Sequence, residues 1–81
     1  MRYADRACKV EERFDNDVHT YTFTGPCLLT KDQCSVTVKA EELNAYRSGK
    51  LIQDAMPSLS PEDREFLISG IGPTGWNKIY P

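Results

Sequence analysis

The 81-residue sequence lacks any long run of apolar residues. A helix that spans a bilayer needs about 20 predominantly apolar residues in a row, and no stretch approaches that length. The N-terminal segment MRYADRACKVEERF is charged throughout and contains no apolar core of the kind that a signal peptide carries. We therefore expect a cytoplasmic protein that does not cross a membrane.

An excess of positive charge is also missing. The chain has 10 Lys and Arg against 12 Asp and Glu, for a formal net charge of −2. Composition therefore dictates no broad basic surface, and a nucleic-acid partner is not expected. Apolar residues make up 40% and charged residues 27%, which is ordinary for a globular protein, and the length fits one small domain over residues 1–81.

Cysteines are few, and none of them forms a CxxC pair. Three cysteines without a secretion signal favour reduced thiols over a disulfide framework. Cys8, His19, Cys27 and Cys34 are nevertheless four potential ligands for a tetrahedral zinc ion. Zinc sites usually present ligand pairs two to four residues apart, whereas six residues separate Cys27 from Cys34. We predict no cofactor, and a Cys3His zinc site is the alternative.

Catalytic motifs are absent too. Gly70, Gly72 and Gly75 do not make a phosphate-binding loop, because no Lys-Ser/Thr follows them and no strand precedes them. A cysteine nucleophile would need His19 beside it in space and a third group to orient the imidazole, and no such group is identifiable. We therefore predict no enzymatic activity. A cysteine-dependent enzyme is the weaker alternative.

What the sequence does have is a series of strand signals in its first half. Cys8–Phe14 alternates weakly and carries enough charge for an edge strand. The residue types of Asp15–Asp17 predict a turn. His19–Thr24 and Cys34–Lys39 alternate strictly, and we expect them to pair as an antiparallel hairpin across the connection Gly25–Gln33. The alternation points one side of each strand to the core, namely Tyr21, Phe23, Cys34, Val36 and Val38.

Helix signals follow in the second half. Ala40–Arg47 has acidic residues early, a basic residue late and Ser-Gly after it. Leu51–Met56 ends at a proline, and a further helix starts at Ser60-Pro61 and stops at Gly70. Strands followed by helices predict an α+β fold, with a two- or three-stranded antiparallel sheet packed against three short helices. Met1–Ala7 is expected to be flexible. The helical residues expected in the core are Leu43, Tyr46, Leu51, Ile52, Ala55, Met56, Leu59, Phe66 and Leu67.

An acidic group surrounds the two central helices, and it consists of Asp54, Glu62, Asp63 and Glu65. These residues form either a solvated face with helix caps or a docking surface for a basic partner. Trp76, Ile79 and Tyr80 have the spacing of one terminal helical turn, which leaves Trp76 as a core residue or as an exposed contact. We take the acidic group and Trp76 as the candidate partner-binding residues.

The run CLLTKDQCSVTV, followed by YRSGKLIQDAMPSLSPEDREFLISGIGPTGW, resembles small uncharacterised proteins encoded by bacteriophages and prophages. The resemblance covers Cys27–Tyr80, and LIQDAMPSLSPEDREFLISG is its most specific part. Members often carry a CPxCW knuckle near the C-terminus, where Gly72 and Gly75 stand in this sequence before Trp76. The resemblance implies a phage-type setting and the loss of two zinc ligands, with Cys27 as a remnant. It implies no activity.

The sequence therefore predicts a small non-enzymatic protein that binds a host or phage macromolecule, for instance as an inhibitor of a host or defence protein. The partner is expected to be a protein, inside the host bacterial cell. The alternative is a zinc-stabilised module, built on Cys8, His19, Cys27 and Cys34, that contacts nucleic acid or protein.

Overall fold

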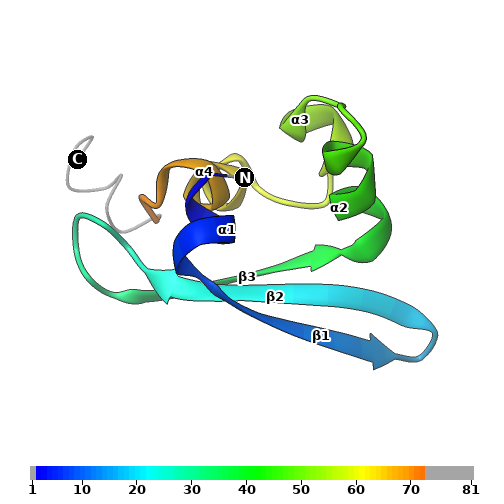
Figure 1. Ribbon diagram of the computed structural model, residues 1–81, viewed down its shortest axis with the longest axis horizontal. Coiled ribbons are helices and arrows are strands. Elements are labelled where there is room, and N and C mark those ends of the chain that lie inside the picture. The colour runs from blue at the N-terminus through cyan, green and yellow to red at the C-terminus, as the bar shows by residue number, and fades with distance from the viewer. Residues whose placement is uncertain (1, 73–81) are drawn as a thin grey trace.

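The computed structural model describes residues 2–72 and confirms the predicted α+β class. A three-stranded antiparallel sheet in the order β1-β2-β3 lies on one side, and the helices lie on the other (Figure 1). None of the helices within residues 2–72 has the length and apolar character that crossing a membrane requires. The elements are α1 (Arg2–Ala7), β1 (Lys9–Asp15), β2 (Val18–Pro26), β3 (Gln33–Lys39), α2 (Ala40–Arg47), α3 (Ile52–Ala55) and α4 (Pro61–Ser69).

The two hairpins of the sheet follow from local sequence. β1 and β2 are joined by Asn16 and Asp17, which both have positive φ (48° and 65°). A two-residue turn of type I′ requires this conformation, and Asn and Asp adopt it more readily than most residues. β2 and β3 form the predicted antiparallel hairpin, with Phe23 opposite Val36.

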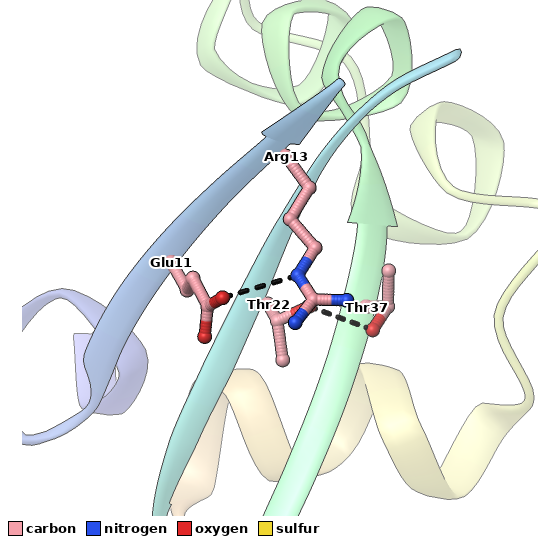
Figure 2. Close-up of polar contacts among 4 residues, drawn as sticks. All are labelled: Glu11, Arg13, Thr22 and Thr37. Carbon is pink, nitrogen blue, oxygen red and sulfur yellow. Dashed lines mark hydrogen bonds and ion pairs between the residues drawn. The ribbon is translucent and has the colours of Figure 1, made fainter. Parts of the chain in front are cut away.

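The sheet has one buried face and one polar face. Phe23, Val36 and Val38 are buried beneath the helices, as their alternation predicts. On the opposite face, the hydroxyls of Thr22 and Thr37 are 2.9 Å apart. Figure 2 shows this pair beside the ion pair of Glu11 and Arg13, on the face that points away from the helices.

Helix α4 begins and ends where its capping residues indicate. The Ser60 hydroxyl accepts a hydrogen bond from the Asp63 backbone N–H (3.2 Å), and Pro61 occupies the first turn. Gly70 has φ of 81°, and its N–H donates to the Phe66 carbonyl (2.9 Å). Phe66 and Leu67 are fully buried, as predicted, and form the centre of the helical layer.

Two sequence-based expectations are wrong. Residues 2–7 are not loose but form α1, in which Tyr3 and Ala4 are buried. The Tyr3 ring contacts Phe66 edge-on at 5.4 Å, and its hydroxyl donates to the Pro26 carbonyl. Leu51 is not a core residue: α3 starts one residue later, and 65% of Leu51 is exposed. Both errors arise because a helix of four to six residues carries no readable periodicity and depends on tertiary packing.

Candidate functional site

The three cysteines gather at the end of the sheet nearest α1. Cys8 immediately precedes β1, and the register of β1 and β2 brings it level with Gly25, which in turn pairs with Cys34 on β3. A Cβ on Gly25 would lie 2.9 Å from Cys8 Sγ, so the glycine makes room for that thiol. A Cβ on Gly72 would likewise lie 2.6 Å from Cys34 Sγ. All three thiols are free.

Cys27 is the most unusual of these thiols. It is fully buried in the β2–β3 connection, where its N–H donates to the Asp32 carbonyl and its carbonyl accepts from Lys31, both at 2.8 Å. The Gly72 N–H donates to its sulfur at 3.3 Å. Burial of the thiol raises its pKa, but hydrogen bonds from Thr30, Gly72 and Leu29 outweigh burial and lower the pKa to about 7.

The other two thiols are shifted in the opposite direction. Burial is the main cause that raises the pKa of Cys8, and the charge of Cys34 adds to it. Burial also raises the pKa of Cys34, with further contributions from Cys27, Asp32 and Asp63. The cluster therefore holds one sulfur that favours the thiolate and two that favour the neutral thiol.

The Cys3His zinc site of the alternative hypothesis does not assemble. His19 lies near the turn end of β2, opposite Phe14, whereas Gly25, which adjoins Cys8 and Cys34, is six residues further along the strand, or about 20 Å. Within residues 2–72, no group of three or more His, Cys, Asp or Glu side chains is placed to hold a metal ion. Gly72 contributes only an N–H to Cys27. The described donor set does not fit zinc.

His19 instead belongs to an aromatic cluster near the turn of the β1–β2 hairpin, which we name the aromatic end: Glu12, Phe14, His19 and Tyr21. The Phe14 and His19 rings are stacked with centroids 4.1 Å apart, and Tyr21 lies 4.9 Å from His19. The Glu12 carboxylate lies 2.6 Å from His19 Nε2 and accepts from the Tyr21 hydroxyl at 3.1 Å. Phe14 is 70% exposed despite this ordered setting.

The position of β1 explains this exposure. β1 is one of the two edge strands of the sheet, and its hairpin partner β2 separates it from β3 and from α2, which packs on β2 and β3 (Figure 1). All seven residues of β1 are exposed, including Val10, which is 53% exposed. Sequence reasoning identified the strand and its turn, but it did not find the aromatic end. The spacing of Phe14, His19 and Tyr21 around the predicted turn is the feature of the sequence that could have indicated it.

The predicted acidic group lies on α3 and α4, and its members are not equivalent. Asp54, Glu62 and Glu65 are exposed, whereas Asp63 is half-buried where its backbone meets the Ser60 cap. Arg64 lies among them and donates to the carbonyls of Gln53 (3.2 Å) and Met56 (3.4 Å), which ties α4 to the end of α3. The acidic residues remain predicted contacts, and Trp76 lies outside the described residues.

The surface of the described part of the chain has two open hollows that could hold a ligand. One, of about 310 Å³, lies beside the hairpin turn and α2, and the other, of about 490 Å³, lies between α1 and the end of α4. Within residues 2–72 neither hollow is lined by a cysteine, and the single histidine in the first has Glu12 as its partner. The first hollow is lined by Asp17, Val18, His19, Lys39, Ala40 and Glu41. The second is lined by Arg2, Tyr3, Arg6, Ala7, Leu28, Ile68 and Ser69.

Comparison of the chain with models of protein families, with curated proteins and with solved structures finds no match.

Proposed function

We propose that this is a non-enzymatic cytoplasmic protein that binds a protein partner of the host or phage through the aromatic end of its hairpin. The observation that carries the proposal is Phe14, which is largely exposed yet held in place by its stack on His19. Aromatic residues that are exposed and already ordered lose little entropy on binding, and they are common centres of protein interfaces.

The chemistry around the thiols supports a binding role over catalysis. Cys27 carries the lowered pKa, but its side chain is fully buried and its hydrogen bonds come from backbone and hydroxyl donors. His19, the sole histidine, lies at the other end of β2 and is engaged by Glu12. A nucleophile and a base that are separated by most of a strand do not form a catalytic pair. The low pKa of Cys27 is therefore assigned to a structural role.

The phage-type setting comes from the resemblance of Cys27–Tyr80, and inhibition of a host or defence protein is one way in which such binding would act. The acidic residues of α3 and α4, with Trp76, are a second predicted contact region. The negative charge of these acidic residues would favour a partner with a basic groove.

The test is affinity capture from bacterial lysate with the full chain and two matched variants. Phe14→Ser removes the exposed ring, whereas Leu51→Ser removes a similarly exposed apolar side chain from the start of α3. A partner that wild type and Leu51→Ser retain, and that Phe14→Ser loses, supports the proposal. Absence of a reproducible partner, or equal capture by both variants, contradicts it.

The acidic region is tested in the same experiment with Glu62→Lys and Glu65→Lys combined. Loss of the partner in this variant, with retention by Phe14→Ser, would place the contact on α4 rather than on the hairpin. Both side chains are exposed, so the folded state is expected to tolerate the change.

A further inference from the structure

The free edge of β1 has features that point to a specific occupant. β1 is at one edge of the sheet, and within residues 2–72 β2 is the one strand that pairs with it. An edge strand presents a row of unpaired N–H and C=O groups, which makes it a template for a further strand. A strand that pairs there has to match both the outward backbone groups and the charges of β1.

The turn determines which backbone groups face outward. In a two-residue hairpin the residues that flank the turn, here Asp15 and Val18, form a hydrogen-bonded pair. Pairing alternates along the ladder, so the odd-numbered residues of β1 bond to β2. The backbone groups of Val10, Glu12 and Phe14 therefore point away from the sheet, where a further strand would meet them.

The sequence of β1, KVEERFD, is complementary to itself in charge. If two copies pair antiparallel about a twofold axis at Glu12, Lys9 lies opposite Asp15, Val10 opposite Phe14, and Glu11 opposite Arg13. Each outward-facing residue then meets another outward-facing residue. All seven residues of each strand are paired.

The neighbouring registers fail on charge. Moving the axis to Glu11 places Lys9 opposite Arg13 and Glu11 opposite itself. An axis at Arg13 instead places Glu11 opposite Asp15 and Arg13 opposite itself. Like charges directly opposite one another are destabilising, and opposite charges are stabilising. The register centred on Glu12 is the only one of the three in which the charged pairs on either side of the axis, Lys9 with Asp15 and Glu11 with Arg13, are all attractive.

We propose that β1 binds β1 of a second copy of this chain, antiparallel and centred on Glu12, to form a six-stranded sheet across a twofold axis. On the polar face, Glu11 and Arg13 of each strand, which Figure 2 shows projecting from the same side, meet Arg13 and Glu11 of the other copy. On the opposite face, Val10 packs on the exposed Phe14 ring of the second copy. The proposal does not depend on the binding function proposed above.

Glu12 is the one unfavourable element, because the two Glu12 side chains meet at the axis. Each carboxylate already accepts a hydrogen bond from Tyr21 and lies 2.6 Å from His19 Nε2, so it has hydrogen-bond partners within its own chain. One strand pair makes a small interface, so we expect a dissociation constant between about 1 μM and about 1 mM.

The first test uses the full chain without a partner. Sedimentation equilibrium from about 1 μM to about 1 mM covers the expected dissociation constants and should show a monomer–dimer equilibrium. Amide hydrogen exchange at Val10, Glu12 and Phe14 should slow as concentration rises, while exchange at Glu11 and Arg13 is already slow through β2. A protein that stays monomeric at about 1 mM, or a dimer in which these three amides exchange unchanged, overturns the proposal.

Charge variants test the register. Arg13→Glu should weaken association about tenfold or more, because it makes two cross-strand pairs repulsive, and Glu11→Arg combined with Arg13→Glu should restore it. Lys50→Glu, in the exposed segment before α3, has the same change of net charge and should have little effect. Glu12→Gln should tighten association. Equal weakening by Arg13→Glu and Lys50→Glu, or weakening by Glu12→Gln, contradicts the register.

A cross-link tests the axis directly. Residues 12 of the two copies form a hydrogen-bonded pair with Cα atoms about 5.5 Å apart, which a disulfide can span. Under mild oxidation, Glu12→Cys should therefore give a covalent dimer well above the background of the three native thiols. Phe14→Cys, whose counterpart lies about 13 Å away along the strand, should not. Equal yields from the two variants would overturn the assignment of the axis.

Discussion

Replacement of Gly70 by alanine is expected to destabilise the fold more than any other glycine change at the end of a helix in the described part of the chain. Gly70 ends α4 with φ of 81°, a conformation that costs an L-residue about 1–2 kcal/mol. A Cβ there would also lie 2.6 Å from Tyr3 Cδ1 and 2.9 Å from Leu28 Cδ1. Overpacking of this kind costs about 1–3 kcal/mol, so the expected total is about 2–5 kcal/mol. That is a large part of the roughly 4–12 kcal/mol available to a chain of this size.

Gly49→Ala is the matched control, because Gly49 also has positive φ (115°) and a Cβ there meets nothing within 4 Å. Urea unfolding of both variants, followed by circular dichroism, gives the two free energies of unfolding. Gly70→Ala should lose at least about 1 kcal/mol more than Gly49→Ala. Equal losses would show that the contact of α1 with the end of α4 does not limit stability, and would refute the packing assigned to Tyr3.

Glu42, Cys27 and Phe14 are expected to affect the free energy of unfolding in three different ways. Glu42→Ala removes the carboxylate that accepts hydrogen bonds from the Ser58 hydroxyl and N–H. Urea unfolding should show that the free energy of unfolding falls by about 1–3 kcal/mol. Glu41→Ala, at an exposed position on the same helix, should lower it by less than about 0.5 kcal/mol. Because the native state lowers the pKa of Cys27 to about 7 while the unfolded thiol titrates near 8.5, this group adds stability above about pH 8.5 and loses it as pH falls through 7. The unfolding free energy of wild type minus that of Cys27→Ala should therefore rise with pH over this interval, and a flat difference would contradict the hydrogen bonds assigned to the thiolate. Phe14→Ser should leave the free energy of unfolding in urea within about 0.5 kcal/mol of the wild-type value, since the ring contributes little to the core, and a larger loss would contradict its exposure.

The elements whose signals lie within a few residues could be predicted without the structure. The alternation in HTYTFT and CSVTVK predicted the pairing of β2 with β3, and Asp15–Asp17 predicted the turn before β2. Ser60 and Gly70 predicted the limits of α4, because caps satisfy backbone groups of the same turn. These features are local, so neighbouring residues alone specify them.

Contacts between distant segments determine which of these surfaces are covered. α1 exists because Tyr3 packs on Phe66, more than 60 residues away, and Cys27 is buried with a lowered pKa because the Gly72 backbone reaches its sulfur. Phe14 alternates in the same way as a core residue, yet it is exposed because the helices cover β2 and β3 and not β1. An alternating pattern shows which side of a strand is apolar. Whether that side meets a helix, water or another chain depends on contacts between segments distant in the sequence.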